Sequence, residues 1–399
     1  MSECPLPEPD QRIAAALMDV EGHLRQHGAR VLPLQPFGFE IEGLHLPALV
    51  RAGTLAHRHP FAAALELLMA HSGLIVFRGQ GVMAAADQIA ASELFGAGQL
   101  HSTHGEHALA GSEHIFRLSN SEADGIVGPG AEWHNDGSFM EEVFSHAGYH
   151  IVQLPRSQTA GTSFAHLGRA HDLLTDAEQR LMSRMISVNS NGGVIHPLVH
   201  THPLSHRATL FLHLAMTGAI AHGSAEQGAR WTALDDDELT ALLSRVNGVL
   251  NDPIVAYHHT YSEGDLVMVD NWAVAHKAFP GSFDPSRGVR VVHRTTIKSP
   301  RTLVPPAEWR LPTMLPQQGR APAWFKPSVA GRVPVWVEGY LGFRWRACDA
   351  VDLAGERSAG LVMMQTPCYA EGDSLPSWMR ASRRRSSDGN ATSWAAALL

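Results

Sequence analysis

The sequence predicts a mainly β protein, an antiparallel sandwich or jelly roll with helices on its outside. Two observations carry this prediction. From Ile115 onward, short apolar segments alternate with Gly, Pro and Asn, which is typical of short antiparallel strands joined by turns. Helical spacing of apolar residues is confined to a few segments, so we expect the helices to flank the sheets.

The first hundred residues are expected to hold several of these helices. Apolar residues at helical spacing run through residues 10–27 and stop at Gly28, a common helix terminator. Further helices are expected at residues 60–70 and 84–94. Between these two helices, the apolar run 74–78 predicts a buried strand, and the sequence from Val31 to Leu46 predicts short strands.

Strands are expected to dominate the centre of the chain. The candidates are residues 115–118, 147–154, 162–165, 209–214, 254–258, 266–269 and 289–297. Two helices interrupt these strands. One begins at the capping-box sequence Thr175-Asp176-Ala177-Glu178, and the other begins at the acidic run 235–238.

Composition divides the chain into three parts. Residues 1–30 are an N-terminal helical extension, residues 31–300 are the β domain, and residues 301–399 are a C-terminal extension with six of the nine tryptophans. Large aromatic side chains predict that this extension packs as a cover over the barrel mouth, as the interface of a homo-oligomer or on the outer helices. They favour the first two arrangements. The polar segment from Arg383 onward is expected to be mobile.

Composition and charge exclude several classes of protein. Hydrophobic residues make up 44% of the chain and charged residues 18%, which is too apolar for a disordered protein. The net charge of -8 argues against a nucleic-acid partner. Cys4, Cys348 and Cys368 are too few and too scattered for a disulfide framework or a zinc site. Neither a secretory signal nor an apolar run of roughly 18 residues is visible, so we expect a cytoplasmic protein without a membrane partner.

The stretch Trp133-His134-Asn135-Asp136-Gly137 carries the main chemical signal. Alternate side chains of a β-strand share a face, so His134 and Asp136 are expected to point to the same side. His276, far downstream, would complete a face of two histidines and one carboxylate, the arrangement used by non-haem Fe(II) oxygenases. The pattern His-x-Asp is weak by itself in a chain with 25 histidines, because an isolated buried histidine usually serves the core.

Two arginines in the strand candidate 289–297 add to this signal. Arg290 and Arg294 are four residues apart and therefore share a face of a strand. Arginine facing into a barrel is costly to bury unless it meets an anion in bidentate geometry. A dicarboxylate bound to the metal would supply that anion, although Arg290 taken alone would more often be a structural or surface residue.

Together these motifs resemble, in order, the Fe(II)- and 2-oxoglutarate-dependent dioxygenases of the taurine dioxygenase and phenoxyacetate dioxygenase type, the TauD/TfdA family. The resemblance runs from about Val31 to Lys298. It rests on Phe77-Arg78-Gly79-Gln80, Trp133-His134-Asn135-Asp136, Gly161-Thr162, the segment from His196 to Pro203, and Gly264 to Asn271 followed by His276. This resemblance implies a double-stranded β-helix, the jelly roll of cupin-like proteins, as the core.

The resemblance also implies a set of site residues and cofactors. His134, Asp136 and His276 would bind Fe(II) as the catalytic metal ligands. Thr162 and Arg290 would hold the distal carboxylate of 2-oxoglutarate, whose keto acid end chelates the metal. O2 would be the second cosubstrate, and ascorbate would support activity. The sequence before Thr162 lacks the paired glycines and the acidic residue that the family often has there.

Three further residues match positions near the substrate in the taurine enzyme, namely Arg294, His101 and Asn120. They imply a small anionic substrate, either a carboxylate or a sulfonate. The remaining histidine-rich segments have the composition of a metal cluster, but their match to structural parts of the family favours a folding role; these residues are His196, His200, His202, His258 and His259.

The expected reaction is hydroxylation of an unactivated C–H bond, with release of succinate and CO2. Desaturation or ring closure by the same chemistry remains an alternative, because the ligands do not determine it. A second alternative is a non-catalytic barrel protein that uses the tryptophan-rich extension for binding. A third is a zinc hydrolase on a similar barrel, which would need neither O2 nor a keto acid and no arginine at position 290.

Overall fold

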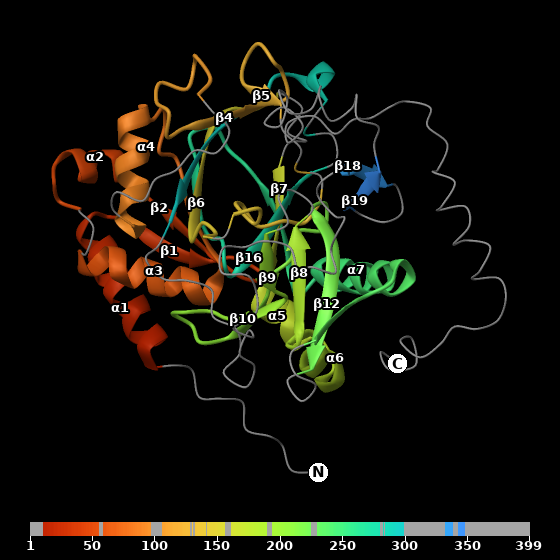
Figure 1. Cartoon of the computed structure of the whole chain (residues 1–399). Coiled ribbons are helices and arrows are strands. Elements are labelled where there is room, and N and C mark those ends of the chain that lie inside the picture. Colours follow the sequence, from red (N-terminus) through yellow and green to blue (C-terminus); the bar gives the residue numbers. More distant parts are fainter. Residues whose placement is uncertain are drawn as a thin grey trace.

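Two facing β-sheets form the core of the structure, which is a computed structural model (Figure 1). It describes residues 11–55, 59–96, 106–127, 130, 132–140, 142–155, 161–189, 194–224, 230–279, 282, 284–298 and the backbone of strands 332–337 and 342–347. Among these residues, no helix combines the length and the apolar character that crossing a membrane requires.

The larger sheet has eight strands in the order β1-β2-β3-β15-β6-β17-β4-β5. Its neighbouring strands are antiparallel except in the β2–β3 and β4–β5 pairs, which are parallel. The strands are β1 (Arg30–Pro33), β2 (Phe39–Glu42), β3 (Leu74–Phe77), β15 (Leu266–Asp270), β6 (His146–Gln153), β17 (Val291–Ile297), β4 (Phe116–Ser119) and β5 (Ile126–Val127). The central four are almost fully buried, because both faces of this sheet are covered; β3 and β15 are largely apolar, whereas β6 and β17 also carry buried polar side chains.

The smaller sheet has three antiparallel strands in the order β14-β7-β16. They are β14 (Ala256–Thr260), β7 (Gly161–His166) and β16 (Val274–Ala278). Phe164 of β7 packs with Val267 and Val269 of the larger sheet, whereas its neighbour Ala165 packs with outer helices. Because side chains alternate along each strand, one face of each sheet packs in a core shared by the two sheets. The other face of each sheet packs in a separate core with the helices outside it.

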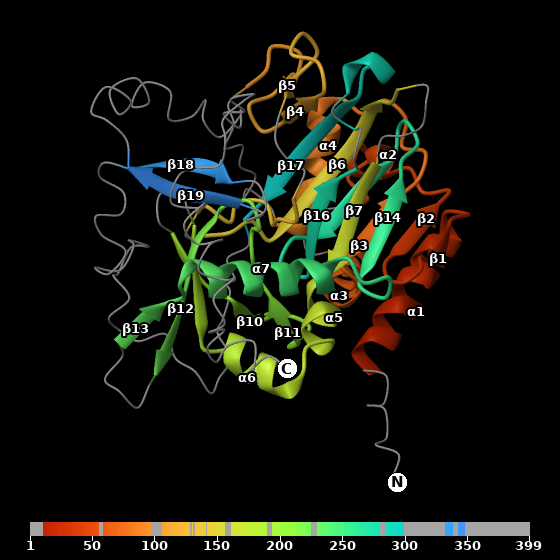
Figure 2. The ribbon, with the colours of Figure 1, turned by 90° about the vertical axis from the view of Figure 1, so that its right-hand side faces the viewer.

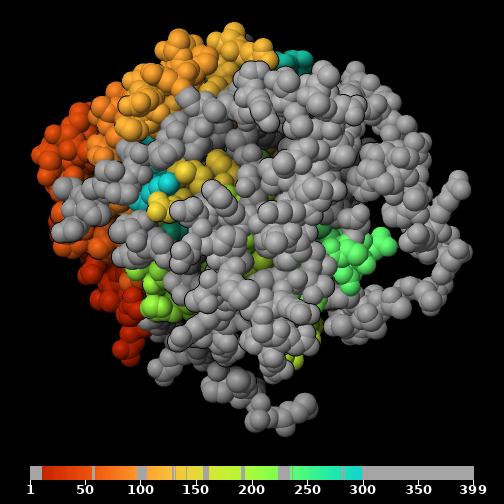
Figure 3. All heavy atoms as spheres, viewed as in Figure 1, coloured from red at the N-terminus to blue at the C-terminus, as the bar shows by residue number. Residues whose placement is uncertain are grey.

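Helices cover the outer face of each sheet. The larger sheet is covered by α1 (Gln11–Gln26), α2 (Leu46–Arg51), α3 (Pro60–Ser72), α4 (Ala85–Ser92) and the 3-10 turn η1 (Glu93–Phe95). These elements form the red and orange left flank in Figures 1 and 3. The other helical elements are α5 (Leu167–Asp172), α6 (Asp176–Met182), α7 (Asp236–Leu250) and the 3-10 turn η3 (Pro285–Arg287). Helix α7 packs beside the smaller sheet, as Figure 2 shows.

The remaining strands form smaller sheets. A four-stranded sheet has the order β13-β12-β8-β9, and two two-stranded sheets are β10-β11 and β18-β19. Their bounds are β8 (Met185–Asn189), β9 (Ile195–Pro197), β10 (Val199–Thr201), β11 (Ala208–Leu210), β12 (Thr217–Ser224), β13 (Arg230–Ala233), β18 (Arg332–Val337) and β19 (Gly342–Ala347). The last two are the only parts of residues 301–399 that the structure describes, so the expected packing of the tryptophan-rich extension stays a prediction.

The structure confirms a mainly β fold with a jelly-roll core and flanking helices. The predicted capping box forms at Thr175, and the helix expected at the acidic run 235–238 begins with a second capping box at Asp235. The prediction of one strand over residues 209–214 was wrong, because β11 ends at Leu210. Beyond that point the backbone N–H groups of Phe211 and Leu214 donate to Leu198 and to the metal-motif residue Trp133, so the chain leaves the strand to support that motif.

Candidate metal centre

His134 and His276 are brought together by a single antiparallel bridge between distant segments. His134 N donates to His276 O at 3.0 Å, and His276 N donates to His134 O at 2.9 Å. The two ring centroids are 4.2 Å apart. With Asp136 they form the only group of three His, Cys, Asp or Glu residues, within the described part of the chain, whose ligand atoms all lie within 4.8 Å.

Asp136 reaches the two histidines by a turn and not by strand alternation, so the expected strand geometry was wrong in this detail. Strand pairing ends at the bridge residue His134, and residues 136–139 form a turn in which Gly137 has φ 75°. A Cβ at Gly137 would lie 2.6 Å from the ring of Phe144. Glycine therefore suits this turn for both its conformation and its size.

Two asparagines fix this turn against the segment before His276. The Asn135 amide donates to Asn271 O at 2.5 Å and to Val274 O at 3.1 Å. In return, Asn271 Oδ1 accepts from Asp136 N at 2.9 Å, while Asn271 Nδ2 donates to Asp136 O and Phe144 O, each at 2.8 Å. Both asparagines are buried. We call this pair of side chains the asparagine clasp, because each one binds the backbone of the other's segment.

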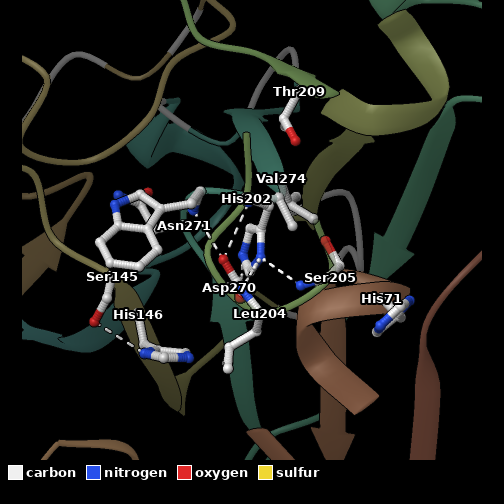
Figure 4. Close-up of polar contacts among 12 residues, drawn as sticks. His71, Ser145, His146, His202, Leu204, Ser205, Thr209, Asp270, Asn271 and Val274 are labelled. Atoms are coloured by element: carbon white, nitrogen blue, oxygen red, sulfur yellow. Dashed lines mark hydrogen bonds and ion pairs between the residues drawn. The ribbon is translucent and has the colours of Figure 1, made fainter. Parts of the chain in front are cut away.

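Asp270 anchors the clasp from behind (Figure 4). Its carboxylate accepts from His202 Nε2 at 3.0 Å and from the backbone N–H groups of Trp272 and Ala273 at 3.0 and 3.1 Å. Burial opposes ionisation of Asp270, but the adjacent His202 and these donors lower its pKa to about 2. An ionised, fully bonded carboxylate therefore holds the turn that carries Asn271.

Both histidines of the group are in the form that binds metals. His134 Nδ1 lies 2.7 Å from Glu132 O, so it donates its proton there and leaves the Nε2 lone pair for a metal. Burial lowers the pKa of His134 and lowers that of His276 to about 3, with a further contribution to His276 from the neighbouring His134. Two neutral imidazoles and one carboxylate are the donor set that the non-haem iron arrangement requires, so these residues fit a divalent metal.

Asp136 is held at both carboxylate oxygens. The Tyr149 hydroxyl donates to Oδ2 at 2.8 Å, and Arg294 donates to Oδ1 at 2.5 Å. Burial opposes ionisation of Asp136, but the Arg294 guanidinium and the two imidazoles keep its pKa well below the usual range. Tyr149 and Arg294 face each other in the β6–β17 register, and Arg294 also lies over the Phe116 ring at 4.6 Å. The carboxylate is therefore ionised before any metal binds.

Arg290 lies immediately before β17, with its guanidinium directed into the protein. Its Nε atom is buried without a hydrogen-bond partner, and the described residues place no carboxylate in an ion pair with it. Burial lowers the pKa of Arg290, and the one group that opposes this effect is Tyr261. Its backbone is fixed by Asn120 Oδ1, which accepts from Arg290 N at 2.9 Å, and by the Ser119 hydroxyl, which donates to Arg290 O at 2.8 Å. Arg290 is thus a positive charge with a fixed backbone, a buried Nε and no anionic partner among the described residues. Such a guanidinium is suited to bind the carboxylate of a ligand.

The other expected residues fall into different places. Thr162 is buried on β7, where it pairs with Ala278 of β16 and so lies two residues from His276 in register. The Asn120 amide also donates to Gly288 O at 3.0 Å, which gives it a backbone-supporting role beside Arg290. His101 lies outside the described residues.

The histidine-rich segments lie apart from the three-residue group. His196 Nε2 is 3.0 Å from Ser138 O, His202 bonds Asp270, and His258 Nδ1 is 2.8 Å from the Ser163 hydroxyl. These hydrogen bonds link neighbouring segments of the protein and so stabilise the fold.

Sequence reasoning missed Tyr149 and His213. The His213 ring centroid is 5.1 Å from that of His134, and its Nδ1 accepts from Met216 N at 3.2 Å, so its proton lies on Nε2. Burial, followed by the nearby His134, holds the pKa of His213 well below its usual range. No local motif marks either residue. The only available signal was the alternation of residues 147–154, which puts Tyr149 on one face with Ala147 and Ile151.

Known proteins match this chain at the level of family and fold. The family model "Taurine catabolism dioxygenase TauD, TfdA family" matches residues 30–296. No curated protein matches the chain. Among solved structures, a taurine dioxygenase from Burkholderia xenovorans is 21% identical, with a TM-score of 0.55 over 70% of this chain and 91% of that one. A second Burkholderia xenovorans protein, assigned as an alpha-ketoglutarate-dependent taurine dioxygenase, is 20% identical, with a TM-score of 0.55 over 70% of this chain and 92% of that one.

AAD-2, solved with Mn(II) and N-oxalylglycine, is 22% identical, with a TM-score of 0.53 over 69% of this chain and 99% of that one. These likenesses show the fold, and the family model covers about two thirds of the chain. The chain therefore belongs to the TauD/TfdA family and is a non-haem iron- and 2-oxoglutarate-dependent dioxygenase, which uses Fe(II), 2-oxoglutarate and O2.

Proposed function

We propose that His134, Asp136 and His276 bind the Fe(II) and that Arg290 and Thr162 hold the distal carboxylate of 2-oxoglutarate. One observation carries this proposal. The structure holds a group of two neutral histidines and an ionised aspartate, and Arg290, four residues before Arg294 in the chain, has a buried Nε and no carboxylate partner among the described residues. A metal held by the three residues would bind the 2-oxo acid end of a ligand, and the arginine would bind a carboxylate at its other end. A 2-oxo dicarboxylate has both of these groups.

We further propose that the enzyme hydroxylates an unactivated C–H bond of a small carboxylate or sulfonate. Bound Fe(II), 2-oxoglutarate and O2 supply the oxidant that removes a hydrogen atom from the substrate, with release of succinate and CO2. Arg294 supports the anionic substrate, because its guanidinium is buried next to Asp136 at the metal group. A metal bound to Asp136 would take up part of its charge and weaken this ion pair, which favours attraction of an anion by Arg294.

The protein's own residues orient the reactants and exclude water. The asparagine clasp fixes the Asp136 backbone, and Tyr149 fixes one of its oxygens. The inner core between the sheets, with Phe164 and Val292 on its walls, is apolar and buried. Such surroundings strengthen the contacts of both arginines with anions. Desaturation or ring closure remains the alternative outcome, because it depends on the position of the substrate and not on these residues.

A screen of carboxylates and sulfonates for substrate-stimulated succinate formation, in the presence of iron and ascorbate, tests the proposal. We expect one or more small anions to stimulate succinate release, with a product heavier by one oxygen atom. His276→Ala should abolish turnover, whereas His258→Ala is a matched control, because His258 is exposed on β14, at the opposite edge of the same sheet, where its side chain hydrogen-bonds Ser163. Full turnover by His276→Ala would contradict the ligand assignment. Stimulation by neutral compounds alone would contradict the anionic substrate.

A further inference from the structure

Tyr261 occupies the inner face of the smaller sheet at the end where Arg290 lies. In the β14–β7 register, His259 pairs with Thr162 and Thr260 pairs with Gly161. Tyr261 follows Thr260 directly, so alternation places its side chain on the same face as those of His259 and Thr162. It is 5% exposed and packs in the core shared by both sheets.

The hydroxyl of Tyr261 is close to both residues proposed to hold the distal carboxylate. It interacts with the Thr162 side chain, which lies on the same face of the adjacent strand, and electrostatically with Arg290. Burial raises the pKa of Tyr261 to about 12, so the phenol keeps its proton and can donate it. The three side chains thus bring together a guanidinium with a buried Nε and the hydroxyl groups of two buried residues.

Among the described residues, no anionic side chain pairs with the Arg290 guanidinium beside Tyr261. The buried Nε of Arg290 has no acceptor, and no described carboxylate forms an ion pair with the guanidinium. A buried donor without an acceptor costs about 1–3 kcal/mol, so donors of this kind indicate a ligand that accepts their hydrogen bonds. A carboxylate has about four acceptor positions, enough for the guanidinium and both hydroxyls.

We propose that Tyr261 is a specificity-determining residue that, together with Arg290 and Thr162, selects a 2-oxo acid carrying a distal carboxylate. This inference rests on the proposed function, because it assigns a third contact to the same cosubstrate. It differs from a packing role for Tyr261, which would need the ring and not the hydroxyl. Removing the hydroxyl alone separates the two roles.

Binding of keto acids to the Mn(II)-loaded full-length protein, measured by calorimetry, tests the inference. The probes are 2-oxoglutarate, its analogue N-oxalylglycine, and 2-oxovalerate, which has the same chain length as 2-oxoglutarate but no distal carboxylate. In Tyr261→Phe we expect the dissociation constants of the first two to rise by about tenfold to a hundredfold, the effect of one lost hydrogen bond to a charged group. Binding of 2-oxovalerate should change by less than about twofold, since it makes no such bond.

Tyr257→Phe is the matched control. Tyr257 lies on the same strand face, but its hydroxyl is 2.8 Å from His259 Nδ1 and is not placed beside Arg290. We expect this variant to keep the wild-type preference for dicarboxylates. Equal preference for 2-oxoglutarate over 2-oxovalerate in Tyr261→Phe and the wild type would overturn the inference about Tyr261 while leaving the proposed function intact. Failure of the wild type to bind either dicarboxylate would overturn the proposed function, and this inference with it.

Discussion

Replacement of Asn271 by alanine tests whether the asparagine clasp sets the geometry of the metal group. The change removes three buried hydrogen bonds, two to the backbone of Asp136 and one to the Phe144 carbonyl. Each orphaned buried group costs about 1–2 kcal/mol, so the free energy of unfolding should fall by about 3–6 kcal/mol. The loss should be larger than that of an exposed asparagine, because no water reaches the orphaned groups.

Metal affinity distinguishes positioning from simple stabilisation. The clasp residue contacts no metal itself but holds the backbone of Asp136, so its loss should weaken binding of Mn(II) or Co(II) by about tenfold to a hundredfold. Urea unfolding gives the stability, and calorimetric titration at a temperature where Asn271→Ala stays folded gives the affinity. Asn251→Ala is the control, because Asn251 is exposed and its side chain bonds Asn247 and Lys277 but no residue of the turn.

Two results would refute this reasoning in different ways. Unfolding free energy within about 0.5 kcal/mol of wild type would show that the three hydrogen bonds contribute little. A destabilised Asn271→Ala variant with unchanged metal affinity would show that the clasp supports the fold but does not place Asp136. The Asn251→Ala control keeps every hydrogen bond of the turn, so we expect it to retain the metal affinity of the wild type.

Three further predictions follow from the buried charges and histidines. Burial lowers the pKa of His166, His196 and His293 to about 4, so below about pH 6.5 these histidines take up protons in the unfolded protein but not in the folded one. The free energy of unfolding of the metal-free protein should therefore fall as the pH falls from about 6.5 to 4, and these three histidines together contribute at most roughly 4 kcal/mol per pH unit. Urea unfolding curves that coincide across this range would contradict the prediction. Arg290→Met should raise the Tm of the ligand-free protein, because it removes a buried cation without a partner, and should abolish stabilisation by 2-oxoglutarate; retained stabilisation in thermal scans would argue against the assignment. Mn(II) should raise the Tm of the wild type but not of His276→Ala, and an equal rise in both proteins would place the metal elsewhere.

Local sequence was sufficient for much of the fold and for the identity of the metal group. A capping box depends on residues three apart and an acidic first turn on adjacent ones, so the helix starts at Thr175 and Asp235 could be recognised directly. His134, Asp136 and His276 were recognised by residue type and by motif. Their convergence, however, was argued from strand alternation, whereas the structure uses a turn at Gly137 and the clasp of Asn271.

The contacts between groups could not be predicted, because they depend on pairing between distant strands. Tyr149 meets Arg294 only because β6 pairs with β17 in one register, and a shift of one residue would put the two side chains on opposite faces of the sheet. Likewise, Tyr261 comes beside Thr162 through the β14–β7 register, about a hundred residues apart in sequence. A single sequence gives the faces of a strand but not which strand lies next to it.

The ion pair between Arg294 and Asp136 has a consequence for the order of assembly. In the iron-free protein the guanidinium serves as an internal counterion, so departure of the metal does not strand a bare negative charge in the interior. An arriving cation would compete with this guanidinium for the charge of Asp136, so more of the positive charge of Arg294 would act on an organic anion bound nearby. If the substrate is an anion, as proposed, we therefore expect the iron-loaded protein to bind it more tightly than the iron-free protein does.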